Sequence, residues 1–139
     1  MSTMKLASKG RFEPPPRLPE HAQTVSTTLA TWRGVVARTH WQLGDESVVD
    51  GADFYVGDEE VGHLHLDGSA HVVAARPIKD ALLEARLAER FPWSDAFVVV
   101  RAKRADQVAH ALWVFELRYD AVGGAPKDAL LARIAARRA

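Results

Sequence analysis

Apolar residues recur three or four positions apart in four segments of the chain, which is the spacing of one face of an α-helix. The first segment covers residues 19–32, and the second begins after Pro77. The third covers residues 105–119, and the fourth begins at Pro126, since proline suits the first turn of a helix. The sequence therefore predicts four helices that each turn an apolar stripe toward a core.

Five other segments have the patterns of β-strands. Residues 35–43 alternate between apolar and polar positions, which is typical of a half-buried strand. Strand-forming runs at 53–56, 60–66 and 69–75 follow one another with short turns between them, and 97–101 is rich in valine. Because successive strands are flanked by helices and do not alternate strictly with them, the pattern predicts an α+β fold. We expect one antiparallel sheet of about five strands, with the helices packed mainly on one face.

The length of 139 residues corresponds to about one domain. Three consecutive prolines begin at Pro14, and proline favours extended backbone over packed structure. We therefore expect a flexible proline-rich arm over residues 1–18 and a single α+β domain over residues 19–139. Six large side chains should be largely buried in that domain: Trp32, Leu82, Val98, Leu112, Phe115 and Tyr119.

The amino-acid composition excludes several classes of function. The chain has 18 basic and 18 acidic residues, so its net charge is zero and nonspecific attraction to nucleic acid is not expected. It has no cysteine, which excludes disulfides, cysteine-ligated metals and a thiol nucleophile. No apolar run exceeds five residues, against about 20 for a membrane helix, and the first 24 residues lack a signal-peptide core. These features predict a cytoplasmic protein with no membrane partner.

Three of the six histidines, His63, His65 and His71, lie within nine residues of one another. Side chains two positions apart on a strand share a face, so His63 and His65 could bind one zinc or iron ion together. The turn decides whether His71 joins them. A two-residue turn at 67–68 puts His71 on the opposite face, whereas a three-residue loop at 66–68 puts it opposite His63 on the same face. The general preference for two-residue hairpin loops favours the first arrangement.

The pair His63 and His65 has three interpretations. The imidazoles could form structural hydrogen bonds, anchor a small ligand in a pocket, or bind a metal. His40, Asp53 and Glu60 are further candidate ligands from neighbouring segments, although His40 is also interpretable as a partly buried structural residue.

Trp93 is the aromatic residue that we expect at the rim of a ligand pocket, because it lies in a Phe-Pro-Trp-Ser-Asp loop outside the predicted helices and strands. The sequence contains no nucleophile elbow, P-loop or dinucleotide-binding motif, so no catalytic residue is assigned. Arg101, Lys103 and Arg104 form a basic cluster that could contact an anion.

Residues 54–68, FYVGDEEVGHLHLDG, resemble the signature of the luciferase domain family of bacteria and fungi, in which an apolar segment leads into Gly-His-Leu-His and a small turn. The resemblance covers roughly residues 34–122, including a helix after Pro77 and a last helix that ends in Leu-Arg-Tyr at 117–119. Two positions depart from the family pattern: His71 stands where aspartate is frequent, and Arg118 where serine is usual. More loosely, the order of elements resembles the YjbR-type α+β fold, whose relatives have been suggested to bind DNA.

The resemblance implies a fold but no defined chemistry, and light emission is not inferred from it. The first functional hypothesis is a binding module for a small molecule or a protein, without a cofactor of its own. The second is a metal-dependent enzyme that uses a divalent ion on His63 and His65. The third is a DNA-binding module that uses residues 101–104.

Overall fold

The computed structural model describes residues 10–42 and 45–138. Six strands form one sheet in the order β1-β2-β3-β4-β6-β5, and every neighbouring pair is antiparallel. The strands are β1 (Val35–Gln42), β2 (Asp45–Val56), β3 (Glu59–His65), β4 (Ser69–Val73), β5 (Glu89–Arg90) and β6 (Phe97–Arg101).

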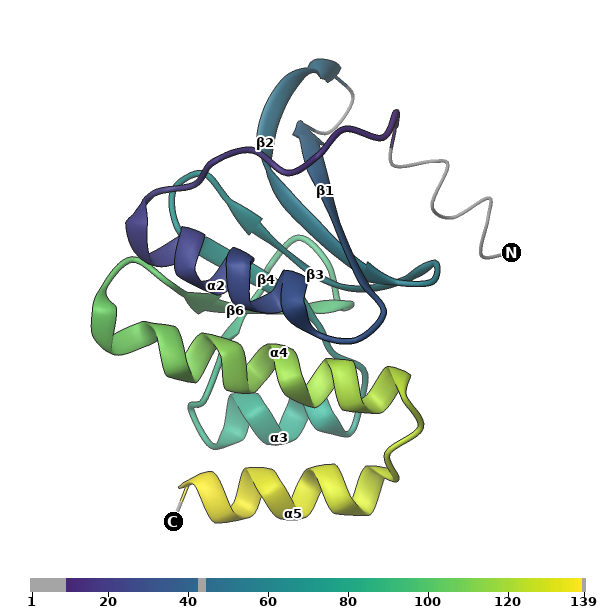
Figure 1. The fold of residues 1–139 in the computed structure, drawn as a ribbon. Coiled ribbons are helices and arrows are strands. Elements are labelled where there is room, and N and C mark those ends of the chain that lie inside the picture. Colours follow the sequence, from purple (N-terminus) through teal and green to yellow (C-terminus); the bar gives the residue numbers. More distant parts are fainter. Residues whose placement is uncertain (1–9, 43–44, 139) are drawn as a thin grey trace.

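Helices α2 and α4 cross one face of this sheet, and α3 and α5 lie beyond them toward one end of the molecule (Figure 1). The predicted α+β architecture is confirmed, with six strands where five were expected. The helical elements are α2 (Glu20–Thr31), α3 (Ile78–Glu84), the short 3₁₀ helix η1 (Ala105–Gln107), α4 (Val108–Val122) and α5 (Lys127–Arg138). In the described part of the chain, no helix is both long and apolar enough to cross a membrane.

Strand boundaries differ from the prediction mainly in β2. It begins at Asp45, whereas the sequence pattern placed its start at Asp53. Residues 45–49 are exposed, so this end of the strand has no buried face to impose an alternating pattern. At the predicted end of the first strand, Leu43 lies outside the described residues.

The hairpin between β3 and β4 has the three-residue loop, so the preference for a two-residue turn was wrong. His63 pairs with His71, and the backbone N–H of Gly68 donates to the carbonyl of His65 at 3.0 Å. Gly68 adopts a positive φ of 87°, which glycine tolerates best. The carboxylate of Asp67 accepts bonds from the backbone N–H and hydroxyl of Ser69 at 2.8 and 2.6 Å. These local bonds stabilise the longer loop.

The core lies between the sheet and the helices. Of the six residues predicted there, Leu82, Val98 and Phe115 are fully buried. The other three are only half-buried, so their predicted burial was too high: Trp32, Leu112 and Tyr119.

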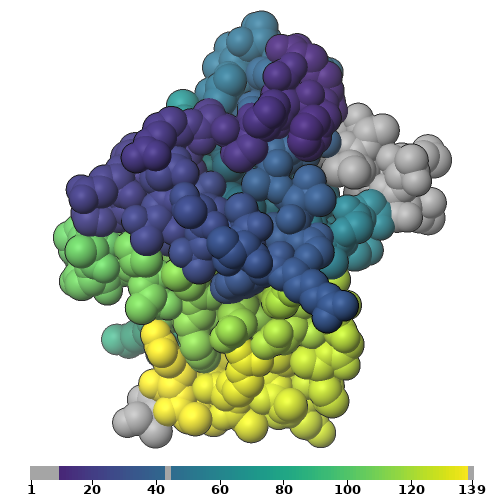
Figure 2. All heavy atoms as spheres, viewed as in Figure 1, coloured from purple at the N-terminus to yellow at the C-terminus, as the bar shows by residue number. Residues whose placement is uncertain are grey.

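Residues 10–18 lie along β1 and are tied to it by hydrogen bonds that the proline pattern did not predict. The N–H of Thr39 donates to the carbonyl of Glu13 at 2.8 Å, and the buried Arg38 guanidinium donates to the carbonyls of Gly10 and Arg11. Figure 2 shows this purple segment resting on the blue strands at the top of the molecule. The expected flexible arm is thus anchored over residues 10–18, and its first nine residues lie outside the described part.

Candidate functional site

Four histidines gather on the sheet face opposite the helices. On β3, Gly62 faces α4, where an added Cβ would lie 2.8 Å from Phe115 Cε1. Its neighbour His63 therefore faces the other side, together with His65. The strand register places His71 of β4 directly opposite His63.

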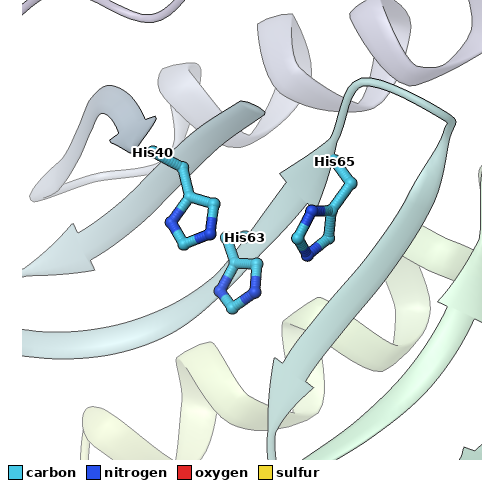
Figure 3. A group of neighbouring side chains, drawn as sticks. All are labelled: His40, His63 and His65. Carbon is cyan, nitrogen blue, oxygen red and sulfur yellow. The ribbon is translucent and has the colours of Figure 1, made fainter. Parts of the chain in front are cut away.

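His40 reaches the same place from β1. It pairs with Gly51 of β2, which in turn pairs with His65, so a glycine separates the two histidines across the sheet. The rings of His40 and His65 lie 5.3 Å apart between centroids, and Gly51 allows the close approach of the β3 backbone, since an added Cβ would lie 1.8 Å from the carbonyl oxygen of Leu64. The ring of His40 also stacks on His63 at 4.2 Å (Figure 3).

Nitrogen atoms of His63 and His65 both lie close to one nitrogen of His71. His71 Nδ1 lies 3.1 Å from His63 Nε2 and 3.1 Å from His65 Nε2. Two nitrogen ligands of a tetrahedral zinc ion are about 3.3 to 3.4 Å apart when each metal–nitrogen distance is about 2.0 to 2.1 Å. The observed separations are close to this value. Ligand nitrogens of His40, His63 and His65 also lie within 4.8 Å of one another.

Carboxylates contact the opposite nitrogens of three rings. Asp53 Oδ1 is 2.7 Å from His40 Nδ1, and Glu60 Oε2 is 2.9 Å from His63 Nδ1. The third carboxylate, Asp50, has its Oδ2 atom 3.1 Å from His65 Nδ1. The contact of His63 with Glu60 is a hydrogen bond, and an ionised carboxylate only accepts, so it places the proton of a neutral His63 ring on Nδ1 and leaves the Nε2 lone pair available. The contacts of His40 with Asp53 and of His65 with Asp50 are close ion-pair approaches.

The proton count at the point of convergence follows from these contacts. When the rings are neutral and His63 and His65 carry their protons on Nδ1, the facing nitrogens share at most one proton, on His71 Nδ1. At least two lone pairs are therefore directed at the same small space. A bound cation would satisfy these lone pairs together.

Burial favours the neutral form of two of these rings, those of His71 and His65. Desolvation, followed by the charges that His63 and His65 could carry, lowers the pKa of His71 from 6.5 to about 3. Desolvation is also the largest cause that lowers the pKa of His65, ahead of the charge of His63. Neutral imidazole is the form that binds a metal.

Behind the histidines lies a buried acidic pair. Asp53 is 1% exposed and Glu60 5%, and both carboxylates face His63, so these three side chains form a second candidate ligand group. Asp53 Oδ2 has no hydrogen-bond partner among the described residues. Such an unsatisfied buried oxygen is costly unless a nearby positive charge compensates it.

A cavity of about 710 Å³ opens onto the histidines. The rings of Phe91 and Phe97 form one side of it, with centroids 5.9 Å apart, and Phe91 stacks against His71 at 4.4 Å. Trp93 lines the rim with 84% of its surface exposed. The structure thus provides room for a small molecule beside the convergent nitrogens.

The structure places the predicted site residues His63, His65 and Trp93 around this one cavity. It adds His71, which the favoured turn had placed on the other face, and His40, for which a structural role had also been considered. Sequence reasoning missed most of the other lining residues, among them Asp50, Phe91 and Phe97. Asp50 lies next to a register shift between β1 and β2, which no alternating pattern could locate.

Arg118, which replaces the usual serine of the family pattern, connects α4 to the start of β3. Its Nε donates to the carbonyl of Glu60 at 3.0 Å, and its Nη2 donates to Glu59 Oε1 at 3.3 Å. This arginine fixes the backbone from which the Glu60 carboxylate reaches His63.

Comparisons with known proteins agree with the sequence motif. Searches of curated proteins and of solved structures found no significant match. The family comparison found one match over residues 58–118, a span that contains the histidine hairpin, α3, β6 and most of α4. This match is to the Luciferase domain, and it confirms the resemblance predicted from the Gly-His-Leu-His hairpin.

Proposed function

We propose that the protein is a metal-dependent enzyme that acts on a small molecule, with a divalent transition metal bound by the histidine cluster. The observation that carries this proposal is the pairing of three imidazoles with three carboxylates at Nδ1: His40 with Asp53, His63 with Glu60, and His65 with Asp50. Metal-ligating histidines are commonly oriented in this way, because the carboxylate fixes the tautomer and makes the other nitrogen more basic.

Three ring nitrogens would hold the ion, drawn from His40, His63, His65 and His71 Nδ1, which leaves a further coordination position open toward the cavity. Imidazole ligands suit zinc, iron, copper and nickel. When bound, such an ion supplies Lewis-acid chemistry, polarising a substrate oxygen or lowering the pKa of a bound water. The carboxylates of the chain orient the imidazole rings toward this ion.

The cavity supports a catalytic over a purely structural metal. Structural zinc sites are closed by four protein ligands, whereas catalytic sites keep a position open to water or substrate. Here the convergent nitrogens border a cavity of about 710 Å³. A ligand in the cavity could reach the metal directly.

A binding module without chemistry is the second candidate. The aromatic side chains Phe91, Trp93 and Phe97 would hold an apolar ligand whether or not a reaction follows. Turnover of a bound compound separates the two functions.

The DNA-binding hypothesis has weaker support. Arg101 forms a two-point ion pair with Glu89 at 2.9 and 3.1 Å, and Arg104 pairs with Asp106 at 3.0 Å. These acids already satisfy the two guanidinium groups that would have to contact phosphate.

Metal analysis tests the proposal. Protein purified without an affinity tag or chelator should contain a transition metal at close to one ion per chain. After removal by chelator, zinc, iron(II), nickel and cobalt(II) should be compared by calorimetry and by thermal shift. His63→Ala and His65→Ala should each remove most of the affinity, because the remaining ligands cannot complete the coordination shell.

His21→Ala is the matched control, since His21 lies on α2 and is absent from both candidate ligand groups. If the purified protein holds no metal, and none of the four ions shifts its melting temperature, the metal-dependent function is wrong.

A further inference from the structure

We infer that the cavity selects a small aromatic molecule that carries a positive charge, and that it discriminates against anions such as phosphates and carboxylates. This inference rests on the proposed function and names its substrate class. It follows from two properties of the cavity, its aromatic side and the sign of its charges.

The aromatic side is continuous from the histidines to the rim. His63 contacts Phe97 at 5.3 Å between centroids, Phe97 contacts Phe91 at 5.9 Å, and Phe91 contacts His71 at 4.4 Å. Trp93 extends this surface outward and is 84% exposed. Aromatic pairs are favoured at centroid distances of about 4.5 to 7 Å, so a flat ring bound here would have several partners.

The charged residues at the rim are acidic. Asp45, Glu46 and Asp50 line the cavity, and no lysine or arginine does so among the described residues. The backbone N–H of Arg11 donates to the Glu46 carboxylate, and the Arg11 guanidinium donates to the backbone carbonyl of Glu46.

Asp45 keeps its negative charge at the rim. Bonds from the hydroxyl and N–H of Ser47 lower the pKa of Asp45, so that it stays ionised. Asp50 contacts only the rings of His40 and His65 among the described ion-pair partners. The carboxylate of Asp45 is thus available to attract a cation, whereas Asp50 belongs to the histidine cluster.

A bound divalent metal would not reverse this preference. The two charges of the metal and the one of the buried Arg38 equal the three negative charges of Asp50, Asp53 and Glu60. The centre would therefore have no excess positive charge for an anionic substrate, while the rim still favours a cation.

The two properties fix the orientation of the substrate. A donor atom at one end would face the histidines and the metal, and the ring would lie against Phe91 and Phe97. The ammonium group would lie at the rim near Asp45.

Two probes with the same phenol ring and opposite charge test the inference. Tyramine carries an ammonium group on its two-carbon chain, and 3-(4-hydroxyphenyl)propionate carries a carboxylate at the same point. Their affinities are to be measured by tryptophan fluorescence and calorimetry on the metal-loaded protein at low salt. We expect tyramine to bind at least about tenfold more tightly, and the difference to shrink in high salt because exposed charges are screened.

Variants identify the source of the preference. Asp45→Asn should reduce the ratio of the two affinities several-fold, whereas Asp106→Asn removes an equal charge far from the cavity and should leave the ratio unchanged. Trp93→Ala should weaken both probes by similar factors, since it removes ring contact and no charge.

The outcomes separate this inference from the proposed function. If metal binds and the propionate binds as tightly as tyramine or more so, the inference is overturned and the metal site stands. If no metal binds, the proposed function fails, and the same two probes on the metal-free protein still decide the inference. There a preference for tyramine supports the acidic aromatic rim, and equal binding or none to either probe overturns it.

Discussion

His63 on β3 lies directly opposite His71 on β4, and His63 Nε2 is 3.1 Å from His71 Nδ1. The loop at 66–68 produces this register, because one residue fewer would turn His71 to the helix-covered face. The hairpin therefore supplies three of the four imidazoles from a short stretch of sequence. His71 is part of the proposed metal site for this reason.

Replacing His71 tests whether it is a ligand in the proposed metal site. His71→Ala should lower zinc affinity at least about tenfold, comparable to His63→Ala, because both nitrogens face the same space. Calorimetry on chelator-treated protein measures the effect, with His21→Ala as the control. Unchanged zinc affinity in a folded His71→Ala variant would show that the 3.1 Å contacts are hydrogen bonds of a structural cluster.

Asp53→Asn should weaken metal binding about 10- to 100-fold, the usual effect of losing a carboxylate behind a ligating histidine. Asparagine keeps the size of the side chain and an acceptor for His40 Nδ1 but removes the charge. The melting temperature of the metal-free protein should not fall, because Asp53 is 1% exposed and its Oδ2 is unsatisfied among the described residues. Asp80→Asn, on exposed α3 surface, is the control. Equal affinities of the two variants would contradict a positioning role for Asp53.

The sequence predicted the parts of the fold that have one buried and one exposed face. The alternation in residues 35–42 located β1, and the helical stripes located α2 and α4. It could not predict β5, which has two residues, or the exposed first half of β2. Neither segment has a buried side that constrains its residue types.

The sequence could predict only the part of the candidate site whose residues lie close together on one strand. His63 and His65 share a face because they are two residues apart on one strand. The positions of His71 and His40 depend on a loop length and on pairing across Gly51, which involve other strands. The carboxylate partners required the same long-range register, so no local pattern identified Asp50.

Gly62→Ala should destabilise the fold by about 1 to 3 kcal/mol or more, because the added methyl group has no space. Its Cβ would lie 2.5 Å from the carbonyl oxygen of His71 and 2.8 Å from Phe115 Cε1. Urea unfolding measures the change. Gly123→Ala is the control, since Gly123 has an ordinary φ of −75° and an added Cβ would lie no closer than 3.4 Å to any neighbour. Equal stabilities of the two variants would mean that α4 can move away from β3 at little cost.

Two leucines of α4 should differ in their contribution to stability. Leu117 is 2% exposed, so Leu117→Ala should cost about 2 to 5 kcal/mol of unfolding free energy. Leu112 is half-buried, and Leu112→Ala should cost less than about 2 kcal/mol because it leaves a smaller cavity. The same leucine-to-alanine change on one helix makes the comparison direct. A larger loss at Leu112 would show that this end of α4 is packed more tightly than its burial indicates.

The metal-free protein should lose stability as the pH falls below about 6.5. Burial, and then the charges of His63 and His65, lower the pKa of His71 in the folded state to about 3, from 6.5. Between these two values the unfolded chain binds a proton that the folded chain does not, so the free energy of unfolding rises with pH across this window. His65, whose pKa is also lowered, acts in the same direction. The urea midpoint should therefore be nearly constant above pH 7 and should fall steadily from pH 6.5 toward pH 4.

His71→Gln removes one of the titrating groups, so its midpoint should fall less steeply over this range, whereas His21→Gln should follow the parent protein. Parallel curves for His71→Gln and the parent protein would show that His71 accepts its proton in the folded state as readily as in the unfolded chain.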